Sequence, residues 1–219
     1  MKKSISPTQK VLNVWAIVLI LWSIYRAKFS TTLPIWVDEF IAKPAVFIFP
    51  VWYFIVKSEK KNFFEGIDLK IKSSYKDIVL GLVIGLIFFF SGALSEFTRT
   101  HTLFSAFKGT PANILYLAVI SLATSISEEI VSRGFVLKRL YAESKNIYMS
   151  SFLVSILFFF LHVPILFTSQ KIFGFLLLRV MITDVILSLA ISFIYIQRRN
   201  LAVPILIHAL YNLSIYIFT

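Results

Sequence analysis

Seven apolar segments, most of them close to the length needed to cross a bilayer, dominate this sequence. They are Val11–Tyr25, Pro44–Val56, Ile78–Ser95, Ala112–Leu137, Ile147–Phe167, Ile172–Ile196 and Leu201–Phe218. A helix needs about 20 largely apolar residues to cross the hydrocarbon core of a membrane. The runs are too long for the strands of a membrane barrel. The sequence therefore predicts an all-α fold, a polytopic transmembrane helix bundle that forms one continuous membrane domain.

Two of these segments leave the number of helices at seven or eight. Pro44–Val56 is short, and the amphipathic stretch Ile35–Lys43 before it either extends this span or forms a separate interfacial helix. Ile172–Ile196 is long and carries Arg179 and Asp184. It is therefore read as one helix, as two helices or as a broken helix.

A soluble fold cannot accommodate this much apolar surface. Of the 219 residues, 58% are apolar and 15% are charged, whereas a soluble domain is roughly a quarter charged. Lipid solvates the outer faces of transmembrane helices, so these faces need no protein cover. The chain contains no cysteine, which excludes disulfides, thiolate metal sites and a cysteine nucleophile.

The net charge of +11 comes mostly from basic residues in the loops between the apolar segments. No basic face interleaved with aromatic residues is present, so nucleic acid is not expected as a partner. With seven spans, most Lys and Arg residues fall on the side of the N-terminus, and Lys43 counts among the fewer on the opposite side. The excess predicts a cytoplasmic N-terminus and a C-terminus on the other side, which an eighth helix would return to the cytoplasm.

The N-terminus has the outline of a secretory signal, with Met1-Lys2-Lys3 before the apolar stretch Val11–Tyr25. Arg26 and Lys28 follow that stretch, in place of a small-x-small cleavage site. We therefore predict a retained first span.

A few ionisable side chains lie within the apolar segments, where such groups are costly and usually functional. They are Glu128, Glu129, Arg133, His162, Arg179, Asp184 and His208, with Asn212 as an uncharged polar member of the set. The remaining histidine, His101, lies in a polar loop and is expected to be solvated.

The segment Ser127–Gly134 places two glutamates and an arginine at helical spacing. Glu129 and Arg133 are four residues apart with the glutamate first, the favourable order for an ion pair on one helix face. Glu128 points about 100° away from that face, so it is free to act as a general base. A structural ion pair near a helix end would explain Glu129 and Arg133 but would leave Glu128 without a role.

The two buried histidines lie on later helices. His162 follows an apolar run that begins after Ser155, and Pro164 is expected to distort the helix just beyond it. His208 and Asn212 are four residues apart and share one helix face. Taken singly, each pattern is as consistent with a structural role, in packing or an interhelical hydrogen bond, as with a functional one.

Together, Glu128, His162 and His208 can converge from three helices around one water molecule. Two histidines and a carboxylate with one open position are a common zinc ligand set, so these residues could bind zinc or another divalent metal. The same groups without a metal could activate water as a carboxylate–histidine pair, with His208 and Asn212 stabilising the oxyanion. The sequence leaves both versions open, although the helical His-Glu-x-x-His zinc signature is absent.

Three motifs follow one another on successive apolar helices. They are Glu-Glu-x-x-x-Arg at Glu128, Glu129 and Arg133, Phe-x-x-x-His at Phe158 and His162, and His-x-x-x-Asn at His208 and Asn212. In this order they resemble the CPBP family, which comprises CAAX prenyl endopeptidases and bacteriocin-processing or immunity proteins, also called Abi proteins. The resemblance implies variable N-terminal transmembrane helices over residues 1–111 and a catalytic helical core over residues 112–219, with the site between the C-terminal helices.

The resemblance also implies an intramembrane endopeptidase. By position, Glu128 matches the water-activating base paired with His162, and Glu129 matches the partner that fixes Arg133. His208 matches the oxyanion side.

Two residues extend this assignment. Asn212 shares the oxyanion role with His208, whereas the metalloprotease description of the family makes His208 a metal ligand beside His162. Asp184 is expected to form a salt bridge with Arg179 or another base.

The expected reaction is hydrolysis of a peptide bond in a membrane-associated peptide or protein, either a bacteriocin- or pheromone-type precursor or a CAAX-like substrate. The short length and the composition rich in Lys, Phe and Ile favour a bacterial plasma membrane. Two other classes of function fit the same residues. One is a non-catalytic bacteriocin self-immunity protein, and the other is a proton-coupled carrier in which the buried acids and histidines form a relay.

Overall fold

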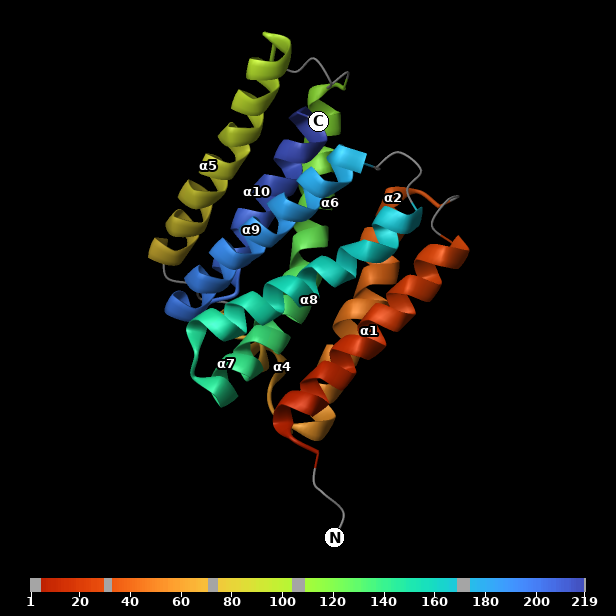
Figure 1. The fold of residues 1–219 in the computed structure, drawn as a ribbon, viewed down its shortest axis with the longest axis vertical. Helices are drawn as coiled ribbons and strands as arrows, with labels where there is room; N and C mark the ends of the chain where they lie inside the picture. The colour runs from red at the N-terminus through yellow and green to blue at the C-terminus, as the bar shows by residue number, and fades with distance from the viewer. Residues whose placement is uncertain (1–4, 30–32, 71–74, 104–108, 169–173, 219) are drawn as a thin grey trace.

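A computed structural model describes residues 5–29, 33–70, 75–103, 109–168 and 174–218. Figure 1 shows these residues as a bundle of long helices. No strand occurs within the described ranges, and the predicted all-α fold is confirmed. The side chain of Arg179 lies outside the described residues, so the predicted salt bridge with Asp184 stays a prediction.

Within the described ranges, six helices are long and apolar enough to cross a membrane, and a shorter apolar helix follows them. The six are α1 (Pro7–Phe29), the run Ile35–Ser58, α5 (Tyr75–Thr100), the run Pro111–Ser144, and the main parts of α8 (Ile147–Thr168) and α9 (Gly174–Arg198). The shorter helix is α10 (Ala202–Phe218). Seven apolar helices over the described residues match the lower predicted number, and the chain is a multi-pass membrane protein.

Two of these spans are composite helices that contain π-helical turns. The first comprises α2 (Ile35–Val37), η1 (Asp38–Ala42), η2 (Pro44–Ile48), α3 (Phe49–Tyr53) and η3 (Phe54–Ser58). The second comprises α6 (Pro111–Glu129), η4 (Ile130–Leu137) and α7 (Lys138–Ser144). The remaining helix, α4 (Phe63–Gly66), is a single turn. Short π-helical stretches within α-helices are frequent at functional sites.

The second span begins earlier than its apolar core suggests. Ile35–Lys43 extends this span and does not form a separate helix. The topology prediction counted Lys43 as a loop residue, and that assignment was wrong, because Lys43 is buried within the helix. The long sixth segment is a single helix over its described residues.

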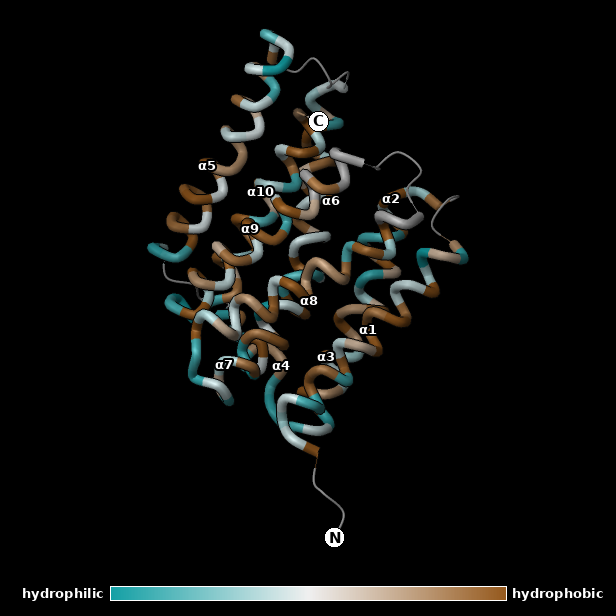
Figure 2. The backbone as a smooth tube through the Cα atoms, viewed as in Figure 1, coloured by the Kyte–Doolittle hydropathy of each residue, from teal (hydrophilic) through white to brown (hydrophobic). Residues whose placement is uncertain are grey.

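The helices lie roughly side by side, with α5 and α1 on opposite sides of the bundle and α6, α8, α9 and α10 between them (Figure 1). α10 packs along α5 and α6, and α8 packs along α9 and α1. Figure 2 shows hydrophobic residues along the bodies of these helices. Many of the large apolar side chains are exposed on the outside of the bundle, where lipid would cover them.

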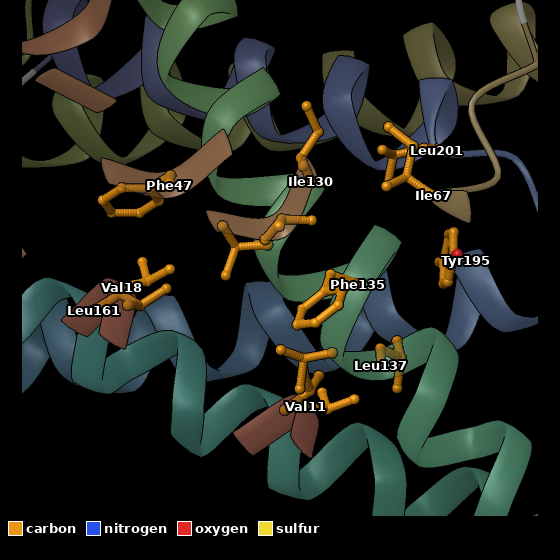
Figure 3. Packing of buried hydrophobic residues seen from close by; sticks show 14 of the residues in the cluster. Val11, Val18, Phe47, Ile67, Ile130, Phe135, Leu137, Leu161, Tyr195 and Leu201 are labelled. Carbon is orange, nitrogen blue, oxygen red and sulfur yellow. The ribbon is translucent and has the colours of Figure 1, made fainter. Parts of the chain in front are cut away.

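The main apolar cluster joins the two halves of the chain. Figure 3 shows Val11 and Val18 of α1 and Phe47 of η2 near Phe135 of η4 and Leu161 of α8. Because these side chains are buried together, the N-terminal helices form part of the same core as the C-terminal helices. The two halves of the chain are therefore held together by one apolar core.

Polar contacts join the helices at the end of the bundle where α7 lies. Arg139 of α7 donates two hydrogen bonds to Glu59, at 2.7 and 2.6 Å. Burial alone would raise the pKa of Glu59, but the hydrogen bonds and charge of Arg139 outweigh it and hold that pKa below its usual range. Asp68 accepts hydrogen bonds from Lys138 at 2.5 Å and from Tyr195 at 2.9 Å. These contacts fix α7 against α9 and the loop after η3.

Glycines on α5 allow α10 to approach closely. A Cβ atom at Gly85 would lie 2.6 Å from Leu210 Cδ1 and 3.2 Å from the carbonyl oxygen of Leu206. A Cβ atom at Gly81 would lie 3.3 Å from the carbonyl oxygen of Val203 on the same helix. Small residues at such contacts let helix backbones pack tightly in membranes. α5 therefore supports the helix that carries His208.

We predict that Gly85→Leu lowers the stability of the protein, because the added side chain must push α10 away from α5. Overpacking of this kind costs about 1–3 kcal/mol. The measurement is the thermal unfolding midpoint of the purified protein in detergent. Ile87→Ala, on the same helix at a residue that is 63% exposed, serves as the control and should shift stability by less than about 0.5 kcal/mol. An unchanged midpoint for Gly85→Leu would contradict the close α5–α10 contact.

Candidate active site

The two adjacent glutamates lie at the end of α6, where the helix continues into the π-helical turns of η4. α6 begins at Pro111, after a capping box formed by Thr110 and Asn113. The backbone N–H of Thr110 donates a hydrogen bond to the Asn113 side chain, and such a box fixes the start of a helix. Its small polar residues permit close packing against neighbouring helices. Glu128 is 4% exposed and Glu129 is fully buried.

Glu129 is neutralised in the way its spacing predicts. Arg133 Nη1 donates a hydrogen bond of 2.7 Å to Glu129 Oε1, and both side chains are fully buried. Arg133 Nη2 donates to the hydroxyl of Ser188 at 2.6 Å and to its backbone carbonyl at 3.0 Å. The guanidinium also lies over the ring of Phe158, 4.7 Å from its centroid. Arg133 thus links η4 to α9 and α8.

Glu128 has a cation partner that sequence reasoning missed. Lys43 Nζ donates a hydrogen bond of 2.9 Å to Glu128 Oε1, and it lies 2.9 Å from Glu39 Oε2. Glu39 is also hydrogen-bonded to Thr124 of α6. The available signal was the i,i+4 spacing of Glu39 and Lys43 just before Pro44. The count of Lys and Arg residues instead placed Lys43 among the loop residues.

The two histidines approach the other oxygen of Glu128. His162 Nε2 lies 3.6 Å from Glu128 Oε2, and His208 Nε2 lies 3.8 Å from the same oxygen. That oxygen is buried and has no hydrogen-bond partner among the described residues. Glu128 therefore presents one oxygen to Lys43 and the other to the imidazoles.

Hydrogen bonds on the far side of each ring set which nitrogen faces Glu128. His208 Nδ1 lies 2.9 Å from Glu129 Oε1, and an ionised carboxylate can only accept, so this nitrogen carries the hydrogen. His162 Nδ1 lies 3.1 Å from the carbonyl oxygen of Phe158 and donates to it by the same reasoning. In neutral rings both Nε2 atoms are acceptors. Three acceptors then face one another, and a group with donor hydrogens, such as water, is what can satisfy them.

The remaining candidate residues lie around this centre. Asn212 Nδ2 donates to Ser125 Oγ at 3.4 Å, so the described contact of the amide is with α6 and not with Glu128. Asp184 of α9 is buried and close enough to His162, His208 and Glu128 to interact with them electrostatically. Of Glu128 and the two histidines, His162 is the most accessible, with its side chain 21% exposed.

The expected metal ligands meet only part of the requirements for a metal site. Among the residues that the structure describes, no group of three or more His, Asp or Glu side chains is arranged to hold a metal ion. The two imidazoles do have the backing hydrogen bonds that metal-binding histidines usually show. However, the Lys43 ammonium is bonded to the same carboxylate, and its charge would repel a divalent cation beside Glu128.

We predict that Arg133→Met strongly destabilises the protein, because it leaves the Glu129 carboxylate buried without its cation. Removing one partner of a buried ion pair costs about 3–5 kcal/mol. The double variant Glu129→Gln/Arg133→Met removes both charges and should recover part of that loss. Thermal unfolding in detergent measures both. If the double variant were no more stable than Arg133→Met, the Glu129–Arg133 contact would not be the source of the loss.

Residues 110–214 match the family described as Type II CAAX prenyl endopeptidase Rce1-like. No curated protein and no solved structure gave a significant match. The matched segment contains the two glutamates, Arg133, both histidines and Asn212, and the match confirms the family resemblance of the motifs. Residues 110–214 of this membrane protein are therefore similar to the Rce1-like type II CAAX prenyl endopeptidases.

Proposed function

We propose that the protein is an intramembrane endopeptidase in which Glu128 and His162 activate a water molecule. The observation that carries the proposal is the buried oxygen Oε2 of Glu128, which has no hydrogen-bond partner in the described part of the chain. It lies 3.6 and 3.8 Å from two imidazole nitrogens. The match of residues 110–214 to an endopeptidase family supports this chemistry. The substrate is a peptide or protein associated with the membrane.

The proposed reaction begins with a water molecule hydrogen-bonded to Glu128 Oε2 and His162 Nε2. Glu128 takes a proton from the water while the hydroxide oxygen forms a bond to the scissile carbonyl carbon. The tetrahedral intermediate then collapses, the carbon–nitrogen bond breaks, and the departing nitrogen takes the proton back from Glu128. The products are a carboxylic acid and an amine, and Glu128 returns to its starting state.

His208 is proposed to stabilise the oxyanion. Its Nδ1–H is bonded to Glu129, so only Nε2 can reach the reacting group, and Nε2 donates only when the ring is protonated. Glu129, which is also bonded to Arg133, holds the ring with Nε2 facing the centre of the site. Asn212 is proposed as a second donor. Its amide would have to break the hydrogen bond to Ser125 Oγ and donate to the oxyanion instead.

A metal-free reaction has more support than a metal-dependent one. If zinc were bound, Glu128, His162 and His208 would hold it, and the ion would polarise the scissile carbonyl. The Lys43 ammonium at 2.9 Å from Glu128 already supplies the local positive charge. We therefore propose that the carboxylate–histidine pair works without a metal.

The proposed setting is a bacterial plasma membrane, with the N-terminus in the cytoplasm. The excess of Lys and Arg in the loops on the side of the N-terminus supports this orientation. The substrate classes proposed are a bacteriocin- or pheromone-type precursor and a CAAX-like protein. Residues 1–111 are proposed as a variable set of transmembrane helices that accompanies the catalytic core in residues 112–219.

We predict that Glu128→Gln and His162→Ala each abolish cleavage of a membrane-associated precursor peptide by the purified protein in detergent or liposomes. Loss of a general base typically costs about 10²–10⁴-fold in rate. The matched control is His101→Asn, which changes the exposed loop histidine and should leave cleavage unchanged. Unfolding midpoints of all variants show whether the fold is retained.

The same variants separate the other two classes of function. Protection of cells against a bacteriocin that survives in Glu128→Gln, with no cleavage by the wild type, would indicate a non-catalytic immunity protein. Proton-coupled uptake in liposomes that is lost in both variants, again without cleavage, would indicate a carrier. Either outcome would overturn the peptidase proposal.

We also predict that a chelator leaves the peptidase activity unchanged. The purified wild type should contain well under one equivalent of zinc or another transition metal by mass spectrometry. Loss of activity in the chelator that returns on adding zinc would favour the metal version. The metal content of Glu128→Gln is the control. Removing a metal ligand should lower the metal content only if the protein binds a metal at this site.

A further inference from the structure

Lys43 lies in the N-terminal part of the chain, outside the segment that matches the endopeptidase family. It is nevertheless in direct contact with the proposed general base. We infer that Lys43 is a positioning residue for the peptidase reaction, which holds the Glu128 carboxylate so that one oxygen faces the two histidines. This inference rests on the proposed function.

The contacts of Lys43 come from three helices. Its ammonium is 2.9 Å from Glu128 Oε1 on α6 and 2.9 Å from Glu39 Oε2 one turn earlier on its own helix. It also lies 5.9 Å from the centre of the Trp22 ring on α1, close enough for a cation–π contact. Lys43 itself is 3% exposed. A long, flexible side chain is thus confined to one position.

This position gives the two oxygens of Glu128 different environments. Oε1 accepts the hydrogen bond from Lys43, whereas Oε2 accepts none among the described residues and faces both imidazoles. Without the ammonium, the carboxylate would be free to rotate about its last bond, since that torsion is broad. A catalytic base misplaced by about 1 Å can lose roughly 10²-fold in rate.

The positive charge of Lys43 also compensates the buried negative charge of the site. Glu39, Glu128, Glu129 and Asp184 are all buried, and buried carboxylates need cations or hydrogen bonds. Arg133 is bonded to Glu129 and not to Glu128. Lys43 is therefore the cation in direct contact with Glu128 among the described residues.

A purely structural ion pair between the second span and α6 is the competing explanation. It predicts that removing Lys43 lowers stability and the amount of folded protein, with the turnover of each folded molecule unchanged. Positioning of the base predicts a lower turnover number for folded protein, with little change in substrate binding. Separate values of kcat and KM distinguish the two explanations.

The test compares Lys43→Met with the wild type, Glu128→Gln and Asp38→Asn in the same cleavage assay, per folded molecule. Lys43→Met should lower kcat by about 10- to 100-fold, while KM changes by less than about threefold. Asp38→Asn is the matched control, since Asp38 is the buried carboxylate next to Glu39 and is bonded to Tyr25 and Arg26 instead. It should lower stability with kcat unchanged.

A second variant covers the case in which Lys43→Met does not fold. Glu39→Gln/Lys43→Met removes one buried charge of each sign, so it disturbs the fold less, and it should show the same loss of kcat. Wild-type kcat in either folded Lys43 variant would overturn the inference while leaving the peptidase intact. No cleavage by the wild type would instead overturn the proposed function.

Discussion

The neutralisation of two adjacent buried glutamates is the constraint on which the rest of this bundle depends. Glu128 and Glu129 follow one another on one helix and point in different directions, so one cation cannot serve both. Arg133 reaches Glu129 from the next turn, and Lys43 reaches Glu128 from another span. In a low-dielectric interior an unpaired carboxylate would cost several kcal/mol. The second span, α6 and η4 must therefore meet at this depth.

The same pairing gives three of the four carboxylate oxygens different partners. Glu129 Oε1 is shared by Arg133 and His208, and Glu128 Oε1 is held by Lys43. Glu128 Oε2 is left to face the imidazoles. Glu129 orients the ring of His208 and Glu128 faces its other nitrogen. The two glutamates thus act on one histidine from opposite sides, although they are chain neighbours.

Features of the site that depend on local spacing could be predicted from the sequence, and those that depend on distant contacts could not. The Glu129–Arg133 pair follows from its i,i+4 spacing, and the long apolar runs predict the spans. The contact between Lys43 and Glu128 joins residues far apart in the chain, and nothing local specifies it. Ser188 was missed for the same reason, because its hydroxyl and carbonyl meet Arg133 only when α9 packs on η4.

The position of Lys43 limits which helices of this protein could be replaced by those of another protein. The matched family segment begins at residue 110, and sequence comparison alone would suggest a self-contained module that any set of membrane helices could precede. The buried Lys43 ammonium lies in the preceding helices and contacts Glu128, so the matched segment does not contain the whole site. A chimera or a gene fusion that replaced those helices would have to supply a cation at the same depth. An exchange of helices at residue 110 would separate Lys43 from Glu128, whereas an exchange before the second span would keep the two residues together.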